Sequence, residues 1–298
     1  MAGKPGCSGM SDAILVTGGT GFVGSHLVQH LRRAGRRVLA HSSKDGDIAT
    51  CRLDFDDVGH VFHLAGRSFV PDSWKSPRAF YDVNVLGTAN VLEFCRRQEV
   101  PLTFVSSYVY GTPRCLPIRE DHPLAPLNPY SHSKILAEDT VRRFGAWFGV
   151  RASIVRPFNV YGPGQNARFL IPTIIRQALD PRCDRITVRD EHPRRDYIHV
   201  ADLVSLLIAT LTRPAGGVYN AGAGRSVSIS ELVIEINTAL DGRKPLHSID
   251  ERRQEEVFDV VADITRAGEE LGWRPRIGLA EGLRDTIQWM QANPIVCR

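Results

Sequence analysis

Residues 17–24 read TGGTGFVG and directly follow the apolar run Ala13–Thr17 (AILVT). Gly19, Gly21 and Gly24 in this stretch satisfy the pattern G-x-G-x-x-G. Glycine is needed at such positions because the backbone must turn tightly and approach a pyrophosphate without a Cβ in the way. The helix that follows points its N–H groups and the positive end of its dipole at the anion. The stretch therefore predicts a dinucleotide-binding loop between a buried strand and a helix, and its alternative is a merely structural glycine turn.

The sequence around this loop alternates between strand-like and helix-like stretches. Short apolar runs are typical of buried strands, and apolar residues at a spacing of three or four indicate helices. The predicted strands are Ala13–Thr17, Arg37–Ala40, His60–Leu64, Leu102–Ser106 and Ala152–Arg156, and the predicted helices are Phe22–Ala34, Phe80–Cys95 and Ser131–Phe148. This alternation predicts βαβ units and therefore a doubly wound parallel sheet of the α/β class.

Beyond about residue 157, glycines and prolines separate shorter elements. We expect helices there in Phe169–Leu179, Ala201–Leu211, Ser230–Leu240 and Leu279–Met290, and a strand near Tyr197–His199. This change predicts a smaller C-terminal α/β cap that binds the substrate. The expected boundaries are 12–157 with parts of 195–225 for a Rossmann-type dinucleotide-binding domain, 158–194 and 226–293 for the cap, and 1–11 for a flexible N-terminus.

Composition is that of an ordinary globular protein. Hydrophobic residues make up 43% and charged residues 23% of the 298 positions, which excludes a disordered or fibrous chain. A net charge of +4 is too small to indicate nucleic acid or a membrane surface as a partner. No apolar run approaches the ~20 residues that a membrane helix needs. The six cysteines are scattered without a C-x-x-C pair, which favours reduced thiols over a metal site, and we expect a cytoplasmic protein without a metal.

The end of the second predicted strand bears on the choice of cofactor. An acidic residue at this place binds the adenosine ribose of NAD, whereas the sequence has His41, Ser42, Ser43 and Lys44 there. These side chains could hold a 2′-phosphate, which favours NADP over NAD. The alternative is that they belong to an ordinary solvated loop.

The segment between residues 41 and 60 is too short for two full helical crossovers. Either a third strand, at Cys51–Phe55, is reached by a bare loop, or a helix is missing. In both cases Asp54 lies where it could contact the adenine.

A tyrosine and a lysine mark the candidate catalytic centre. Tyr130 and Lys134 are four residues apart, which places them on one face of a predicted helix near its start. The charge of Lys134 can lower the pKa of the phenol so that it exchanges a proton with a carbinol. Ser106 lies at the carboxyl end of a predicted strand, where open α/β sheets bind ligands and a hydroxyl can steady developing charge.

Eight motifs occur in order along the chain. They are TGGTGFVG at 17–24, HLAG at 63–66, NVLGT at 84–88, SSYVYG at 106–111, YSHSK at 130–134, RPFNVYGPG at 156–164, RDYIHVADL at 195–203 and LGWRP at 271–275. Together they resemble the extended short-chain dehydrogenases/reductases, the NAD(P)-dependent nucleotide-sugar epimerase, dehydratase and reductase family. The resemblance runs from about Ala13 to Asn293 and implies a Rossmann-type sheet with a substrate-binding cap.

The resemblance, together with the patterns above, assigns roles by position. The catalytic set is Ser106, which stands four residues before the Tyr of VYG, with Tyr130 and Lys134. The residues expected to bind the cofactor are Gly18, Gly21, Phe22, Val23, Gly24, His41, Ser42, Ser43, Lys44, Asp54, Phe55, Leu64, Ala65, Gly66, Asn84, Tyr130, Lys134 and Pro157. The residues expected to bind the nucleotide-diphosphate sugar are Ser107, Tyr108, Asn159, Arg195, Arg253 and Glu256, with the arginines suited to phosphate oxygens.

One departure from the family pattern concerns the reaction. In the family's 4,6-dehydratases, Asp-Glu follows the catalytic hydroxyl and supplies the acid and base for water elimination, whereas this chain has Ser107-Tyr108. The departure argues against a dehydratase. Tyr108 could serve as a proton donor or as a wall of the sugar pocket, and we favour the wall. His132 and His199 are expected to be surface or core histidines.

Three main functions remain at this point, beside an oxidoreductase that acts on another ketone or alcohol. The first is an NADPH-dependent reductase of a 4-keto nucleotide sugar with Tyr130 as acid and base. The second is an NAD-dependent nucleotide-sugar 4-epimerase that uses the same residues. The third is a dinucleotide sensor without turnover, which a tuned phenol argues against. The resemblance also suggests a homodimer that packs the helices Phe80–Cys95 and Ser131–Phe148 into a four-helix bundle.

Overall fold

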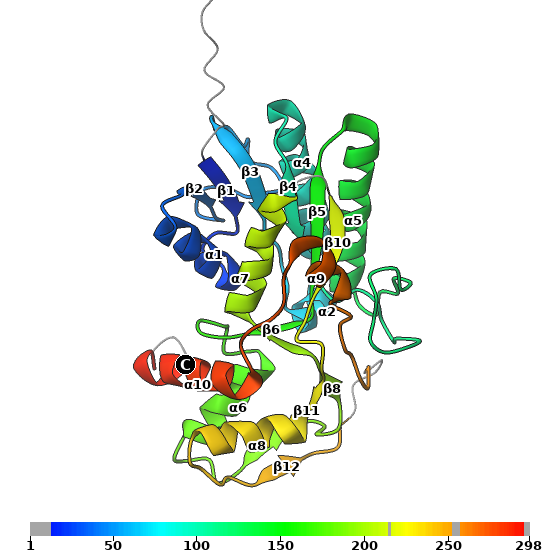
Figure 1. Ribbon diagram of the computed structural model, residues 1–298. Helices are drawn as coiled ribbons and strands as arrows, with labels where there is room; N and C mark the ends of the chain where they lie inside the picture. Colours follow the sequence, from blue (N-terminus) through cyan, green and yellow to red (C-terminus); the bar gives the residue numbers. More distant parts are fainter. Residues whose placement is uncertain (1–12, 214–215, 252–256, 295–298) are drawn as a thin grey trace, which may run out of the picture.

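The computed structural model describes residues 13–213, 216–251 and 257–294. Its centre is a parallel sheet of six strands in the order β10-β5-β4-β3-β1-β2 (Figure 1). The strands are β1 (Ala13–Thr17), β2 (Arg37–His41), β3 (Val58–His63), β4 (Leu102–Val105), β5 (Ala152–Pro157) and β10 (Gly217–Ala221). Strand β1 is buried along its whole length, as an apolar run between two helical layers requires.

The strand order reverses between β1 and β3. From β1 the chain goes to β2 on one side, and then crosses back to β3 on the other side of β1. At such a point the connections leaving two neighbouring strands run in opposite directions and leave a crevice that binds ligands. Gly18 follows β1 and Leu64 follows β3, so both lie at this crevice.

Helices cover both faces of the sheet. One face packs against α1 (Phe22–Arg33), α7 (Val200–Ala209), which η2 (Thr210–Thr212) extends, and α9 (Thr265–Leu271). The other face packs against α4 (Gly87–Gln98) and α5 (Pro129–Phe148), and α2 (Val70–Lys75), α3 (Pro77–Tyr81) and the π-helix η1 (Asp82–Leu86) lead into α4. The predicted helix Phe80–Cys95 is therefore one continuous helical run that contains a π-helical turn.

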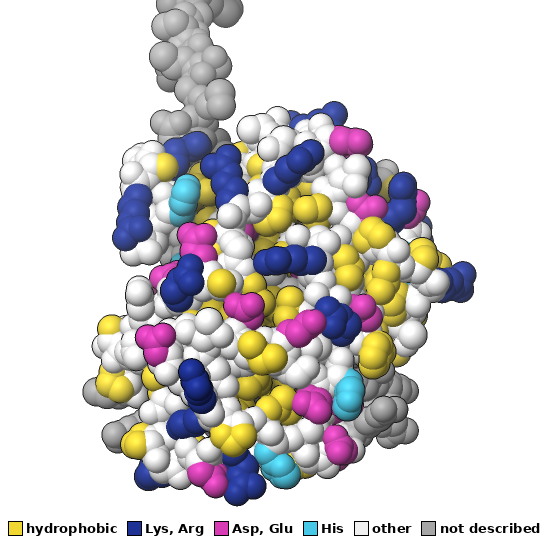
Figure 2. Space-filling model, turned by 60° about the horizontal axis from the view of Figure 1, so that its bottom comes forward, with side chains coloured by type: hydrophobic (Ala, Val, Ile, Leu, Met, Phe, Trp, Pro, Cys, Tyr) yellow, Lys and Arg dark blue, Asp and Glu magenta, His cyan; other side chains and the backbone are white. Residues whose placement is uncertain are grey.

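The remaining elements form a smaller cap below the carboxyl ends of the strands (Figure 1). They are β6 (Asn159–Tyr161), α6 (Leu170–Leu179), β7 (Ile186–Val188), β8 (Arg194–Arg195), β9 (Tyr197–His199), β11 (Val227–Ser228), α8 (Ile229–Ala239), β12 (Leu246–Ser248) and α10 (Leu279–Ala292). Helices α6, α8 and α10 enclose their own apolar cluster, which contains Ile174, Ile236 and Leu283. On the face seen in Figure 2, basic and acidic side chains are interspersed among hydrophobic ones. The predicted fold class, a Rossmann-type sheet with a smaller C-terminal α/β cap, is confirmed.

Two details differ from the sequence-based expectations. The third strand expected at Cys51–Phe55 is wrong, because residues 42–57 connect β2 to β3 as turns and loop without a strand or a helix. Leu53 anchors this connection in the core, and Asn90 on α4 donates hydrogen bonds to two of its carbonyl groups. Helix α9, in the range expected for the cap, packs in the cluster on the sheet instead. The exact boundaries of the two units stay a prediction.

Within the described ranges, no helix has the length and apolar character needed to cross a lipid bilayer.

Candidate functional site

The glycine-rich loop after β1 has a shape that only glycine allows. Gly18 has φ +70°, and a Cβ there would lie 2.7 Å from the backbone N of Ala65. A Cβ on Gly24 would lie 2.1 Å from the carbonyl O of Gly18. Gly21 precedes α1 and donates its N–H to the same oxygen at 2.9 Å, and among the described residues no side chain caps the start of this helix. The loop and the exposed helix N-terminus therefore fit a pyrophosphate, as the sequence predicts.

The floor of the crevice is a directed hydrogen-bond chain. Thr17 Oγ1 accepts from the N–H of Ala65 (3.3 Å) and lies 2.7 Å from His63 Nδ1. His63 Nε2 lies 3.0 Å from Thr88 Oγ1, which donates to the carbonyl of Asn84 (2.6 Å). Burial and the nearby Lys134 charge lower the pKa of His63 to about 3, so its ring is neutral and carries its proton on Nε2. This chain fixes the backbone at residues 64–66, where the cofactor is expected.

Asn84 ties the crevice to α5. It lies in the π-helix η1 and is buried, with Oδ1 accepting from the N–H of Arg67 at 2.8 Å. Its Nδ2 donates to the carbonyl of Arg67 (3.1 Å) and to Ser133 Oγ (2.9 Å). Ser133 in turn donates to the carbonyl of Tyr130 at 2.7 Å. Asn84 therefore positions the first turn of α5, and both the oxygen and the nitrogen of its side-chain amide are hydrogen-bonded to other groups of the protein.

Tyr130 and Lys134 lie where the sequence predicts, in the first two turns of α5. Asn128 and Ser131 form a capping box that starts this helix. Lys134 is 5% exposed, its Nζ donates to the carbonyl of Val105 at 2.7 Å, and it lies 4.2 Å from the ring centroid of Phe104. Burial lowers the pKa of Lys134 to about 7, and the Glu138 carboxylate opposes this by raising it. Lys134 therefore changes between its charged and its neutral form near neutral pH.

The Tyr130 phenol interacts with the side chain of Ser107, whose Oγ also lies 3.5 Å from the carbonyl O of Tyr108. Burial raises the pKa of Tyr130 above its ordinary value, and a hydrogen bond with the side chain of Ser107 opposes this rise. The lowering by the Lys134 charge that the sequence analysis expects is not found. Ser106 is 4% exposed, and its Oγ donates to Glu138 Oε1 at 2.6 Å. The hydroxyl of Ser106, which the sequence analysis expects to be catalytic, therefore donates its hydrogen to a buried carboxylate.

The alternation of side chains along β4 was a signal for this difference. Phe104 packs in the cluster that β4 shares with α4 and α5, and alternation carries Ser106 to the same face, toward α5. Counting back from the VYG tyrosine does not take this alternation into account. Sequence reasoning also did not select Glu138.

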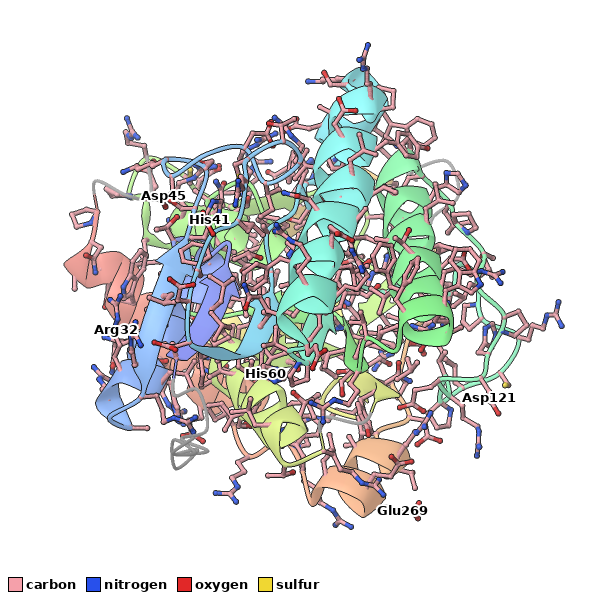
Figure 3. The ribbon with its side chains drawn as sticks, turned by 90° about the horizontal axis from the view of Figure 1, so that it is seen from above. Arg32, His41, Asp45, His60, Asp121 and Glu269 are labelled. Atoms are coloured by element: carbon pink, nitrogen blue, oxygen red, sulfur yellow. The ribbon has the colours of Figure 1, made fainter. Side chains whose placement is uncertain are left out.

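The loop after β2 contains a carboxylate that the sequence analysis missed. Asp45 accepts from the backbone N–H of Ser42 (2.9 Å) and from Ser42 Oγ (2.8 Å), and these bonds lower the pKa of Asp45. Figure 3 shows Asp45 and His41 close together beside the end of β2. His41 and Ser42 are buried, whereas Ser43 and Lys44 are exposed. A carboxylate is thus present near the adenosine end of the site, but it closes a turn within the loop.

The residues expected near the adenine differ in placement. Phe55 is half-buried and contacts His41 edge-on, with ring centroids 6.4 Å apart, so it lies beside the tip of β2. Asp54 is exposed, and its Oδ2 lies 3.7 Å from Nη2 of Arg52. Of this pair, the structure brings Phe55 to the loop after β2.

Tyr108 belongs to an aromatic wall that it forms with Tyr110 and Phe158. Its ring contacts those of Tyr110 and Phe158, with centroids 5.7 and 5.3 Å away, and its phenol donates to the carbonyl of Gly111. Burial raises the pKa of Tyr108 strongly, and the nearby charge of Arg195 lowers it. A phenol that is protonated and bonded to a backbone carbonyl fits the expected wall rather than a proton donor.

Asn159 and Arg195 lie on the same side as this wall. Asn159 Nδ2 donates to the carbonyl of Asp196 at 3.2 Å, and Arg195 donates to the carbonyls of Arg194 (2.8 Å) and Val257 (2.7 Å). Pro157 is buried at the end of β5. Arg253 and Glu256 lie outside the described residues.

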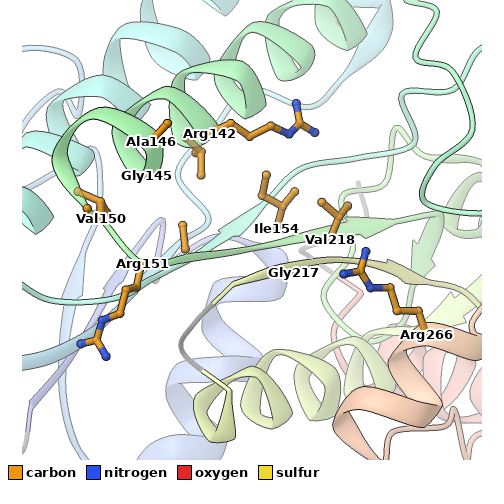
Figure 4. Close-up of a pocket in the computed structure, with 12 residues that line it drawn as sticks. Arg142, Gly145, Ala146, Val150, Arg151, Ile154, Gly217, Val218 and Arg266 are labelled. Atoms are coloured by element: carbon orange, nitrogen blue, oxygen red, sulfur yellow. The ribbon is translucent and has the colours of Figure 1, made fainter.

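A second hollow, of about 490 Å³, lies between α5 and the edge of the sheet (Figure 4). It is lined by Arg142, Arg151, Arg266 and by glycine, alanine and branched aliphatic residues in the second half of α5 and at the start of β5 and β10. These are the amino ends of the strands, opposite the edge that carries Ser107 and Gly18. The hollow is therefore separate from the candidate site.

Comparison with known proteins adds to this geometry. Residues 14–222 match the model of the NAD dependent epimerase/dehydratase family. The chain is 32% identical to a putative UDP-glucose 4-epimerase of Methanocaldococcus jannaschii, over 94% of this chain and 99% of the relative. It is 31% identical to the GDP-6-deoxy-D-mannose reductase of Pseudomonas aeruginosa, over 92% of this chain and 96% of the relative.

Two solved structures are similar over nearly the whole chain. One is TunA, described as an NAD dependent NDP-hexosamine 5,6-dehydratase, with a TM-score of 0.87, 31% identity and coverage of 95% of this chain and 98% of that one. The other is RMD from Pseudomonas aeruginosa complexed with NADPH, with a TM-score of 0.86, 30% identity and coverage of 94% and 99%. The proteins similar to this chain thus include epimerases, reductases and dehydratases.

Proposed function

Because the chain belongs to the NAD dependent epimerase/dehydratase family, we propose that it reduces a 4-keto nucleotide-diphosphate sugar with NADPH. That it is an NAD(P)-dependent enzyme of nucleotide sugars follows from its family and relatives. Tyr130, Ser107 and Lys134 at the carboxyl edge of the sheet support hydride transfer in general. The observation that favours NADPH, and with it the reductase, is the loop after β2, where Ser43 and Lys44 are exposed and Ser42 holds Asp45 in a turn.

The chain's own residues supply the proton and the charge. When bound, the dinucleotide supplies the hydride that reaches the carbonyl carbon of the substrate. Tyr130 then donates its phenolic proton to the carbonyl oxygen, and Ser107 donates a hydrogen bond that stabilises the negative charge developing there. Lys134 favours the phenolate left on Tyr130, since a cation nearby stabilises the charged form. The glycines of the loop after β1 and the start of α1 would hold the pyrophosphate.

The loop after β2 supports the preference for NADP(H). Asp45 is the carboxylate nearest to this position in sequence, and two hydrogen bonds from Ser42 to its Oδ2 hold it in a turn within the loop. Ser43 and Lys44 are exposed and can meet a 2′-phosphate. RMD, a structure 30% identical to this chain, binds NADPH.

The alternative is an NAD-dependent 4-epimerase. The chain is as similar to a putative UDP-glucose 4-epimerase as to a reductase, and the same three residues would serve both reactions. A dehydratase is less well supported despite the similarity to TunA, because Ser107-Tyr108 supplies no carboxylate after the hydroxyl and the Tyr108 phenol is bonded to Gly111.

For the substrate, we propose that Asn159 and Arg195 bind the diphosphate, together with Arg253 and Glu256. The aromatic wall of Tyr108 and Phe158 would then limit the size of the sugar pocket. We also propose a homodimer through α4 and α5. Large apolar side chains on or just before these two helices are exposed, namely Leu86, Leu136, Trp147 and Phe148.

The first experiment is to denature freshly purified protein and identify any dinucleotide released. We expect no cofactor or only traces of NADP(H), since a reductase exchanges its cofactor at every turnover, and NADPH oxidation that depends on a 4-keto nucleotide sugar. Near-stoichiometric NAD(H), together with interconversion of two sugar epimers, would replace the reductase by the epimerase.

A further inference from the structure

Glu138 is a fully buried carboxylate that accepts four hydrogen bonds. Its Oε1 accepts from Ser106 Oγ (2.6 Å) and Arg156 Nε (2.9 Å). Its Oε2 accepts from Arg156 (2.7 Å) and Arg142 (2.6 Å). Burial raises the pKa of Glu138, but the bonds and charge of Arg156, with Ser106 and Arg142, bring it below its ordinary value. The group is therefore a permanent negative charge inside the protein.

Stability alone does not account for such a cluster. A buried ion pair is often no more stabilising than apolar residues of the same volume, because both charges lose their hydration. The position of this one is informative. Glu138 lies one turn beyond Lys134 and two turns beyond Tyr130 on α5, and Ser106 directly precedes Ser107. The cluster thus joins the two elements whose relative placement sets the distance between the phenol and the hydroxyl.

We propose that Glu138 is a positioning residue: by holding Ser106, it fixes Ser107 opposite the Tyr130 phenol. This inference rests on the proposed function and deepens it. Ser106 also donates its backbone N–H to the carbonyl of Val155 at 2.7 Å. The backbone and the side chain of Ser106 are thus both held at the start of the segment 106–110.

The other end of the segment is held by the same cluster. Arg156 donates to Tyr110 Oη at 2.9 Å, and Tyr110 donates to Asn220 Oδ1 at 2.5 Å. Arg156 therefore binds Glu138 and Tyr110 at once, and it is 2% exposed. The five residues from Ser106 to Tyr110 span the gap between these two attachments, with Ser107 and the Tyr108 wall between them.

Glu138 has a second effect through its charge. The groups that face Lys134 are the Val105 carbonyl and the Phe104 ring from β4, the neutral His63 from β3, and Glu138 itself on α5. Glu138 supplies the negative charge in this set. Its removal is therefore expected to make the Lys134 ammonium easier to deprotonate.

The test compares Ser106→Ala with Ser153→Ala. The first removes the hydroxyl that links Glu138 to the segment and leaves the Glu138–Arg156 bonds in place. The control removes a hydroxyl that is 1% exposed and has no hydrogen-bond partner within the described residues, from the neighbouring strand β5. We expect Ser106→Ala to lower kcat by about 10- to 100-fold, as small misplacements do, with the Kd for NADPH within about twofold of the parent. Ser153→Ala should change neither.

Hydrogen exchange provides a readout that does not need turnover. Amides in residues 106–111 should exchange faster in Ser106→Ala than in the parent and in Ser153→Ala. Glu138→Gln, where it folds, should move the basic limb of the pH–kcat profile to lower pH. Exchange and kcat in Ser106→Ala equal to the parent would overturn the inference, and so would a larger loss of kcat in Ser106→Ala than in Ser107→Ala. A parent that binds no dinucleotide would instead overturn the proposed function, while exchange would still decide how the segment is held.

Discussion

Replacing Gly24 by alanine separates cofactor binding from helix stability. A Cβ at this position would lie 2.1 Å from the carbonyl O of Gly18 and 2.9 Å from its carbonyl C, and both atoms are backbone. Since real Cβ contacts are essentially never shorter than 3.0 Å, the loop and the first turn of α1 must move apart by about 1 Å. The displaced loop is the one shaped for the pyrophosphate. The substitution should therefore weaken NADPH binding.

The magnitude follows from two opposing terms. Overpacking costs about 1–3 kcal/mol, whereas Gly→Ala inside a helix contributes about 1 kcal/mol in the other direction. For stability the two terms leave a net loss of about 0–2 kcal/mol, so the melting temperature should fall by no more than about 8 °C. For binding, only the displacement counts, and about 1–3 kcal/mol corresponds to a Kd about 5- to 150-fold higher.

The assay is a fluorescence titration of NADPH with the parent, Gly24→Ala and Gly278→Ala. Gly278 precedes α10 with φ −69°, and apart from its chain neighbours no atom of the described residues lies within 4 Å of where its Cβ would stand. It is therefore a matched control in open space. Gly278→Ala should bind NADPH as the parent does. A Gly24→Ala variant with unchanged affinity would refute the reasoning, because the loop would then tolerate the displacement or would not hold the cofactor.

Four further predictions test the site. Tyr130→Phe should lower turnover by about 10²-fold or more with an unchanged Kd for NADPH, and an unchanged kcat would remove the phenol from the mechanism. Lys44→Ala should weaken NADPH more than NADH in paired titrations, whereas equal losses would argue against a 2′-phosphate contact. Arg195→Ala should raise the KM for the nucleotide sugar and leave the cofactor Kd unchanged, which initial-rate kinetics with each ligand varied would show. Burial lowers the pKa of Lys134 to about 7, so the folded protein binds fewer protons there than the unfolded chain above about pH 7, and the parent should gain thermal stability relative to Lys134→Met as pH rises from about 7 to 10.

The parts of the site that could be predicted from sequence are those fixed by local geometry. The glycines of residues 18–24 are required by the turn itself, whatever packs around it. Tyr130 and Lys134 share a helix, so their spacing alone places them on one side. The alternation of strands and helices likewise follows from patterns within each segment.

The parts that could not be predicted depend on partners far away in sequence. Ser106 and Ser107 are adjacent hydroxyls at the end of β4, and the choice between them is made by Glu138, 32 residues after Ser106. Asp45 makes its turn with Ser42 in a loop that takes the place of the expected third strand. Residues 42–57 could not be assigned because their buried apolar side chains, Ile48 and Leu53, show no helix or strand periodicity.

The buried charges explain why the site is built on α5. An isolated ammonium buried as Lys134 is would lose its proton at neutral pH, which would remove the cation that the phenol needs. The Val105 carbonyl and the Phe104 ring partly replace its hydration, and Glu138 one turn later supplies the opposite charge. Glu138 can do so because Arg156, with Ser106 and Arg142, keeps it ionised, and Arg156 also holds Tyr110. The charge state of Lys134 and the position of Ser107 thus depend on one cluster, so a substitution that disturbs either should disturb both.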